Sequence, residues 1–144
     1  MARRPVAAVA AVLLFLEAAG IVLVNMILGI SVDRQKMSLG GLDPDAMSLS
    51  TWIMGGVFGL YLAACAVVLV RCALTGRAPG RFARILLITC AVVHGVLGAL
   101  TVGLVGWAAF AFMMVVFGLI VLTLVAFPAE RREAPAAPPA PAES

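Results

Sequence analysis

Charged side chains are scarce in this sequence. Asp, Glu, Lys and Arg make up 12% of its 144 residues and 64% are hydrophobic, whereas soluble domains carry about 25% charged residues. From position 85 to position 127 the chain has no acid, lysine or arginine. This composition excludes an ordinary soluble domain, because a core of this size does not need so much apolar surface. It indicates an integral membrane protein of one domain.

The motifs that mark common enzyme classes are also missing. The chain has no P-loop, no HExxH, no CxxC and no Gly-x-Ser-x-Gly sequence, each of which serves a defined chemistry. No polar stretch is long enough for a soluble catalytic domain. Its basic residues form no stripe interleaved with aromatics, so nucleic acid is not an expected partner. We therefore predict that the protein is not an enzyme.

Histidine and cysteine are too few for a conventional metal or cofactor site. His94 is the only histidine, so one chain cannot supply a haem with two histidines. The odd number of cysteines (Cys65, Cys72 and Cys90), all in or beside apolar segments, argues against a disulfide framework. Cys90 and His94 share a helix face and could form a three-ligand set with Glu17. Without a second Cys or His pair, buried small side chains are the simpler interpretation, and we predict no metal and no cofactor.

Four apolar runs are long enough to cross a membrane, at about 6–30, 50–70, 85–105 and 108–127. As one helix, residues 85–127 would measure about 65 Å, twice the thickness of the hydrocarbon core. This stretch must therefore fold back, and Gly103, Gly106 and Trp107 mark the turn. Pro128 ends the last helix. The predicted fold is all-α: an integral membrane four-helix bundle over residues 1–128. The first run exceeds the core of a cleaved signal peptide and is expected to be retained.

The distribution of lysine and arginine predicts the orientation. Only Arg34 and Lys36 lie in the link 31–49. Eight arginines lie on the side of the termini: Arg3, Arg4, Arg71, Arg77, Arg81, Arg84, Arg131 and Arg132. The positive-inside rule then places both termini in the cytoplasm and the protein in the cytoplasmic membrane.

Two segments outside the spans have recognisable compositions. In the link 31–49, Asp43-Pro44-Asp45 predicts a helix start, with Asp43 as the N-cap and Pro44 in the first turn. Residues 129–144 are rich in proline and alanine and lack bulky apolar side chains. They are predicted to be a disordered cytoplasmic tail.

Few polar side chains lie inside the spans, and several share one depth. Glu17 lies about 16 Å into the first span and His94 about 14 Å into the third, both counted from the cytoplasmic side. Tyr61, on a span that runs the other way, falls at the same level. Asn25 lies about 80° around the helix from Glu17 and can face the same groove. We expect an intramembrane polar cluster of Glu17, Asn25, Tyr61 and His94, in which Glu17 and His94 approach each other.

Two interpretations of this cluster stay open. In the structural one, the side chains satisfy each other by hydrogen bonds of about 1 kcal/mol each and hold the helices in register. In the functional one, they form a proton relay or a ligand site, as intramembrane ionisable groups commonly do.

Small residues recur at the spacing that allows helices to approach closely. Gly55 and Gly59 lie on the second span, and Ala91 and Gly95 on the third. We expect these faces to pack within the bundle, with homodimerisation as the alternative.

Two resemblances follow from these features. The bias toward Ala, Val, Leu, Gly, Arg and Pro over four spans resembles the small four-span membrane proteins of actinobacteria, which implies no activity. Glu17-Ala-Ala-Gly20 resembles the Glu-x-x-Gly setting in the first helix of small multidrug resistance transporters. That resemblance implies that Glu17 exchanges protons for a cation. The longer first loop, the tail and the asymmetric arginines depart from the family, and Tyr61 is the only mid-span aromatic suited to a cation.

The expected function is therefore a non-enzymatic subunit or partner-binding component of a membrane complex. Its expected partners are the lipid bilayer and a membrane protein or a second copy of the chain. The alternative is a proton-coupled small-molecule transporter that uses Glu17.

Overall fold

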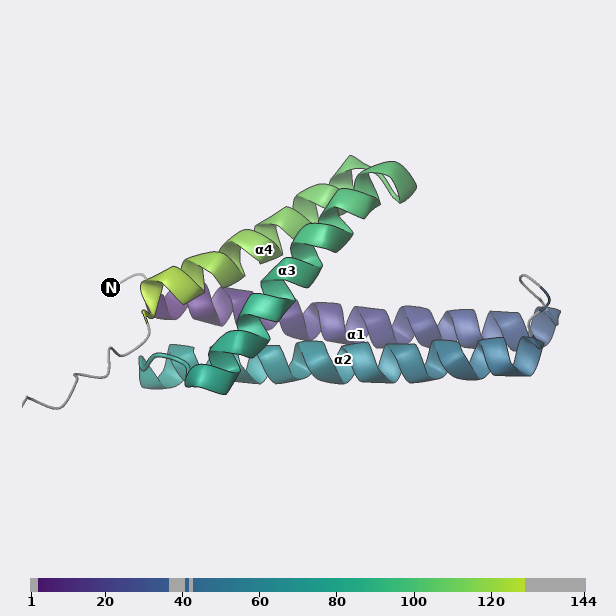
Figure 1. Ribbon diagram of the computed structural model, residues 1–144, viewed down its shortest axis with the longest axis horizontal. Helices are drawn as coiled ribbons and strands as arrows, with labels where there is room; N and C mark the ends of the chain where they lie inside the picture. The colour runs from purple at the N-terminus through teal and green to yellow at the C-terminus, as the bar shows by residue number, and fades with distance from the viewer. Residues whose placement is uncertain (1–2, 37–40, 42, 129–144) are drawn as a thin grey trace, which may run out of the picture.

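The computed structural model describes residues 3–36, 41 and 43–128, and this part of the chain forms four helices (Figure 1). They are α1 (Arg3–Gln35), α2 (Pro44–Thr75), α3 (Arg81–Leu104) and α4 (Trp107–Ala126). Each is long and apolar enough to cross a membrane. The prediction of an all-α protein with four membrane-spanning helices is confirmed, and the chain is a small multi-pass membrane protein. The predicted tail 129–144 lies outside the described residues.

The helix ends follow from their local sequence. As predicted, Asp43 is the N-cap of α2: its side chain accepts a hydrogen bond of 2.8 Å from the backbone N–H of Asp45, and Pro44 opens the helix. After α2, Gly76 adopts the left-handed conformation at φ 68°, and its N–H donates to the carbonyl of Cys72. Gly106, at φ 118°, makes the predicted turn between α3 and α4. The last helix ends at Ala126, just before Pro128.

The first two helices are longer than the apolar runs within them. α1 has 33 residues and α2 has 32, which corresponds to about 50 Å each, whereas the hydrocarbon core is about 30 Å thick. Most of the link expected at 31–49 is therefore helical, because α1 continues to Gln35 and α2 starts at Pro44.

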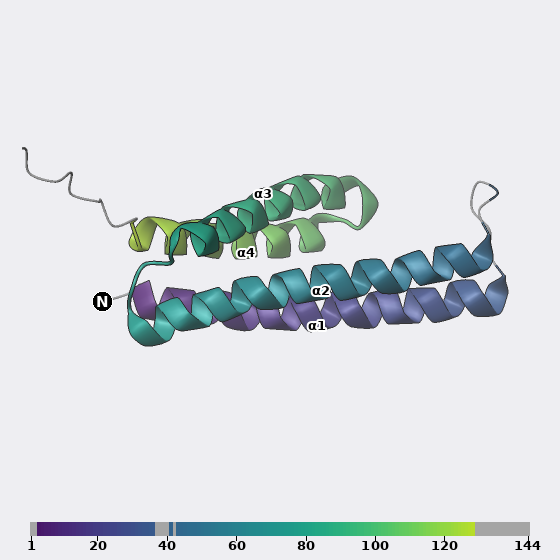
Figure 2. The same ribbon diagram turned by 60° about the horizontal axis from the view of Figure 1, so that its bottom comes forward.

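The helices form two antiparallel hairpins stacked in two layers. The pair α3–α4 crosses the pair α1–α2 at an angle (Figures 1 and 2), with α4 packed on α1 and α3 on α2. The α3–α4 pair covers the half of the first hairpin that contains the start of α1 and the end of α2. The other half, around Gln35 and Pro44, extends past the turn between α3 and α4. The expected four-helix bundle is thus complete at one end only.

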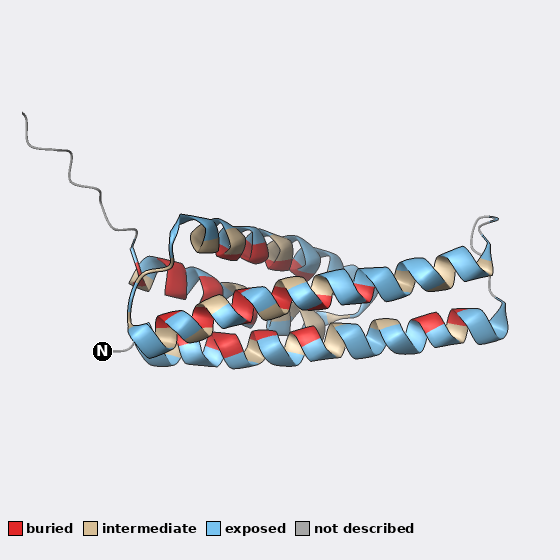
Figure 3. Cartoon of the chain, turned by 90° about the horizontal axis from the view of Figure 1, so that it is seen from below, coloured by how far each residue is buried: buried red, intermediate tan, exposed pale blue. Residues whose placement is uncertain are grey.

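The core lies in the covered half. The large side chains of Leu14, Leu69, Leu87 and Ile120, one from each helix, are fully buried there, and most of the buried residues gather at this end (Figure 3). Small residues surround them and let the backbones approach.

Buried positions in the first hairpin alternate in steps of three and four. This spacing is seen on α1 at Ala7, Ala11, Leu14 and Ala18, and on α2 at Gly55, Gly59, Leu62, Ala66 and Leu69, while other buried residues such as Ala10 and Cys65 lie outside it. This spacing is the heptad pattern of a left-handed coiled coil, so α1 and α2 remain in contact along their length.

The predicted small residues differ in how tightly they are packed. A Cβ atom added at Gly55 would overlap Asn25, and one added at Gly59 would overlap Val22. Ala91 is buried in the core, whereas a Cβ atom at Gly95 would lie 3.7 Å from the ring of Phe117, an ordinary contact. The tightest approach on α3 is at Gly98, which the sequence analysis did not single out. There an added Cβ atom would overlap Met114.

Candidate functional site

The structure brings Glu17 and His94 into direct contact between the two hairpins. The Oε2 atom of Glu17, on α1, lies 2.9 Å from Nε2 of His94, on α3. The side chain of His94 is 2% exposed and that of Glu17 is 13% exposed. The sequence placed both at one depth on two helices that run in the same direction. Packing of the second hairpin on the first then turns the two side chains toward each other.

The second ring nitrogen of His94 fixes the protonation pattern of the pair. Its Nδ1 atom lies 2.8 Å from the backbone carbonyl oxygen of Cys90, and a carbonyl can only accept. Nδ1 therefore carries a hydrogen, as assigned from this hydrogen bond. The contact between Nε2 and Oε2 then holds a single proton, either as imidazolium and carboxylate or as neutral imidazole and carboxylic acid. Both forms have no net charge, which limits the cost of burial in an apolar environment.

The remaining polar groups in the described core are also satisfied. Thr123, the other buried polar residue, donates a hydrogen bond of 2.8 Å to the carbonyl of Leu119. The Sγ atom of Cys90 lies 3.6 Å from Nδ1 of His94. Among the residues that the structure describes, no buried side-chain nitrogen or oxygen lacks a hydrogen-bond partner. Every buried polar atom of the site is therefore paired within this part of the chain.

Tyr61 is not brought to the pair. Its hydroxyl lies 3.0 Å from Oγ1 of Thr89 and 3.3 Å from the carbonyl oxygen of Leu86. These groups lie on α3, one to two turns before His94. The Tyr61 contact is thus a second polar link between the hairpins, from α2 to α3, and the described hydrogen bonds do not connect it to Glu17.

Asn25 also lies apart from Glu17 and His94. Its side-chain amide donates a hydrogen bond of 2.8 Å to the carbonyl of Ile21 on its own helix. Its Cβ atom packs against α2 at Gly55. Of the four polar residues singled out in the sequence, the structure joins Glu17 and His94 and separates the other two.

The geometry around His94 leaves little room for a metal ion. Its two ring nitrogens face the carbonyl of Cys90 and the carboxyl group of Glu17. Within residues 3–36, 41 and 43–128, no group of three or more His, Cys, Asp or Glu side chains is arranged to hold a metal ion.

A groove of about 580 Å³ runs along the first hairpin. Ala18 and Ala19, which follow Glu17, line it together with Val22, Gly59 and Ala63. Glu17 and His94 are not among its lining residues. The groove is apolar, which suits a lipid chain or an apolar helix.

Arginines at the opposite end from Gln35 cap two helices, a role that the sequence analysis did not assign to them. Arg4 donates hydrogen bonds to the carbonyls of Ala73 and Leu74, at the end of α2. Arg84 donates a hydrogen bond of 3.0 Å to the carbonyl of Phe127, just after α4. Cations at helix C-termini are stabilising because these ends carry partial negative charge. The position of these arginines beside the ends of the apolar runs was the available signal.

No protein-family model, no curated protein and no solved structure matches this chain. The Glu17–His94 pair can clamp two hairpins together and hold one proton. The arginine-rich end can attract anions.

Proposed function

We propose that this chain is a non-enzymatic component of a membrane complex. In this role the Glu17–His94 pair locks α3–α4 onto α1–α2. The supporting observation is that both ring nitrogens of His94 and the Oε2 atom of Glu17 form hydrogen bonds within the chain, and that one proton neutralises the pair. A site that binds or transports a substrate usually keeps polar groups free to receive it.

The uncovered half of α1–α2 is the proposed partner surface. Ile27 and Leu28 on α1 and Ile53 on α2 are at least half exposed there, and no part of α3–α4 covers this end. A partner helix or a second copy of the chain would pack on this half, and lipid would cover it otherwise.

The orientation is part of the same proposal. We place both termini in the cytoplasm and the protein in the cytoplasmic membrane. Six arginines occur in the described residues at the end that holds the start of α1 and the link between α2 and α3: Arg3, Arg4, Arg71, Arg77, Arg81 and Arg84. At the other end the described basic residues are Arg34 and Lys36, and this asymmetry of lysine and arginine supports the predicted topology.

A proton-coupled transporter remains the second candidate, because one observation favours it. The pair holds a single proton, and the side chain of Glu17 is 13% exposed. A carboxyl group in that position could exchange its proton when a cation enters. Gly20, the glycine of the Glu-x-x-Gly setting, has open space around it.

Flux measurements separate the two candidates. Purified full-length chain is reconstituted into liposomes, and a pH gradient drives uptake of tetraphenylphosphonium. Wild type is compared with Glu17→Gln, which keeps a hydrogen-bonding amide, and with Tyr61→Phe as a control that removes another in-span polar group. The proposal expects no uptake above empty liposomes for any of the three. Uptake by wild type and Tyr61→Phe that is lost in Glu17→Gln would establish the transporter instead.

Photo-crosslinking tests the partner surface in native membranes. A crosslinking amino acid is placed at Ile27 or Ile53 in the uncovered half, and at Val125 on α4, which is more exposed than either, as the control. We expect one defined protein adduct from Ile27 and Ile53 and none from Val125. Crosslinks to lipid alone at all three positions would contradict the proposal.

A further inference from the structure

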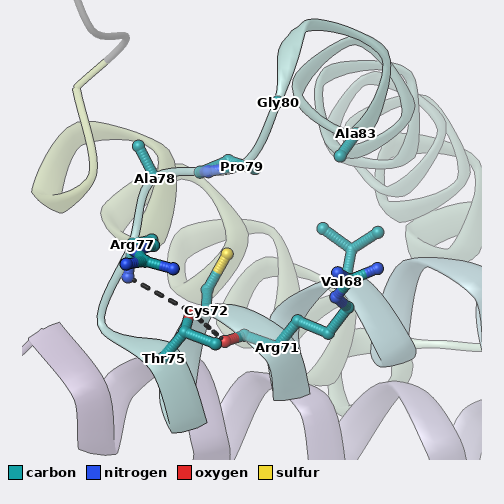
Figure 4. A pocket seen from close by; sticks show the side chains of 9 residues that line it. All are labelled: Val68, Arg71, Cys72, Thr75, Arg77, Ala78, Pro79, Gly80 and Ala83. Atoms are coloured by element: carbon teal, nitrogen blue, oxygen red, sulfur yellow. Dashed lines mark hydrogen bonds between the residues drawn. The ribbon is translucent and has the colours of Figure 1, made fainter.

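A cavity of about 310 Å³ lies where α2 ends and α3 begins (Figure 4). Arg71 and Thr75 of α2 and Arg77 of the link contribute its polar lining. Val68 and Cys72 of α2 and Ala83 of α3 contribute an apolar wall. In Figure 4 the two arginines come from different segments, and the side chain of Cys72 points from α2 toward the link between them. The cavity therefore combines cationic and apolar surfaces.

Local hydrogen bonds hold the rim of this cavity in place. The hydroxyl of Thr75 donates to the carbonyl of Arg71 at 2.7 Å and accepts from the backbone N–H of Arg77 at 3.2 Å. Gly76, in the left-handed conformation, directs the chain away from the helix axis at this point. The backbone that carries Arg77 is thus tied to the last turn of α2, which keeps both arginines beside the same cavity.

The charge at this end is not balanced within the described residues. Arg4 and Arg84 are engaged in capping helix carbonyls. Arg71 and Arg77 are exposed, and no acidic side chain of the described part forms an ion pair with either. Two guanidinium groups with planar donor forks beside one cavity suit a phosphate group, which accepts such forks in a bidentate manner.

We propose that this cavity binds a phosphate group, with Arg71 and Arg77 as its donors. A phospholipid headgroup and a soluble phosphate share this chemistry. The apolar wall favours the lipid: the cavity lies where the apolar runs of α2 and α3 end, so Val68 and Ala83 would meet the start of the acyl chains. Basic pockets between membrane helices commonly receive anionic headgroups in this way. The site is separate from Glu17 and His94 and does not depend on the role proposed for them.

Native mass spectrometry of the detergent-solubilised full-length chain tests the site, with phosphatidylglycerol as the probe and phosphatidylcholine for comparison. The cavity variant is Arg71→Gln with Arg77→Gln. The matched control is Arg3→Gln with Arg81→Gln, which loses the same charge at the same end from positions that do not line the cavity. We expect one phosphatidylglycerol bound to wild type, and binding weaker by about tenfold or more in the cavity variant, since each charged hydrogen bond is worth roughly a factor of ten. The control should stay within about twofold of wild type.

Two results would overturn the proposal. Equal weakening in the cavity variant and its control would mean diffuse attraction to a charged end, and equal binding of phosphatidylcholine would mean no selectivity for an anion. Competition by inorganic phosphate separates the two sources of the ligand. Displacement of the lipid at submillimolar phosphate would keep the phosphate site and reject the lipid assignment, and persistence of the lipid would support it.

A variant counts as folded if its helical circular dichroism spectrum matches that of wild type. If the double variant fails this check, Arg77→Lys provides the test. Lysine keeps the charge and loses the fork, so a site built for phosphate should bind several-fold more weakly.

Discussion

The two hairpins are built from similar apolar sequences but pack in different ways. In α1–α2 the glycines lie against groups that cannot easily move: Gly59 against the β-branched side chain of Val22, and Gly55 against the Cβ atom of Asn25. In α3–α4 the closest approach is at Gly98, where an added Cβ atom would overlap only the terminal methyl group of Met114, the flexible end of a long side chain, and would lie 3.3 Å from the Cβ atom of Met113. The first hairpin therefore has one well-defined helix separation, whereas the second can adjust its own.

The contact between the two hairpins differs from the contacts within each of them. Most of this contact is apolar, and apolar packing alone does little to fix the depth and rotation of one helix against another. The Glu17–His94 pair is its buried polar element, and its hydrogen bond of 2.9 Å requires one depth and one rotation of α3 against α1. In a membrane, where apolar faces gain little by choosing protein over lipid, such a contact has a large share in fixing the arrangement.

The largest effect is expected from His94→Leu, which should lower the stability of the two hairpins by different amounts. It leaves the carboxyl group of Glu17 without its partner inside the bundle. We expect a loss of about 3 kcal/mol in stability, near the lower end for a broken buried pair. The chain has two tryptophans, Trp52 on α2 and Trp107 on α4, so single-tryptophan versions report each hairpin during unfolding in SDS. The midpoint SDS concentration of the Trp107 transition should fall further than that of the Trp52 transition.

The matched controls are Glu17→Leu and the double variant. Glu17→Leu leaves a histidine that can stay neutral and keep its bond to Cys90, so its cost should be about 1 kcal/mol. The double variant replaces the pair with apolar side chains and should recover most of the loss. Equal losses from both single variants, with no recovery in the double, would argue against a coupled pair.

An intermediate effect is expected from alanine at the glycines, and it should differ between the hairpins. Gly59→Ala must push α1 away or distort Val22, so we expect a net loss of about 1–2 kcal/mol. Gly98→Ala displaces a methionine methyl group and gains helix propensity of about 1 kcal/mol, so the net change should be close to zero. Gly56→Ala, with open space around its Cβ position, is the control and should be neutral or stabilising. SDS unfolding followed by circular dichroism gives all three values. A larger loss at Gly98 than at Gly59 would reverse the comparison.

The sequence predicted well how deep each polar side chain lies in the membrane, but predicted poorly which way each helix is rotated. The apolar runs predicted four helices, and counting residues placed Glu17 and His94 at one level. Depth alone cannot tell which way a side chain faces. Tyr61 was placed at the same level, but the rotation and crossing of α2 and α3 direct it to Thr89 instead. The close approach of α3 and α4 depends on the fit of side chains such as Met114 at Gly98, which composition and spacing do not encode. The helical extension of α1 to Gln35 was missed because polar residues there looked like a loop.

The smallest effect is expected from Asn25→Ala, which compares two polar residues of the same helix. Asn25 and Glu17 both lie in the apolar part of α1, but Asn25 donates to the carbonyl of Ile21 on its own helix and Glu17 bonds to another hairpin. The alanine keeps the Cβ atom that packs on Gly55. The bond it removes goes to a carbonyl that remains available to the helix ladder. We expect a change within about 0.5 kcal/mol, below the average for a hydrogen bond between membrane helices, and no difference between the Trp52 and Trp107 transitions. A loss above about 1 kcal/mol at Trp52 alone would mean that the Asn25 amide also serves the α1–α2 contact, and that this contact depends on a polar group as the contact between the hairpins does.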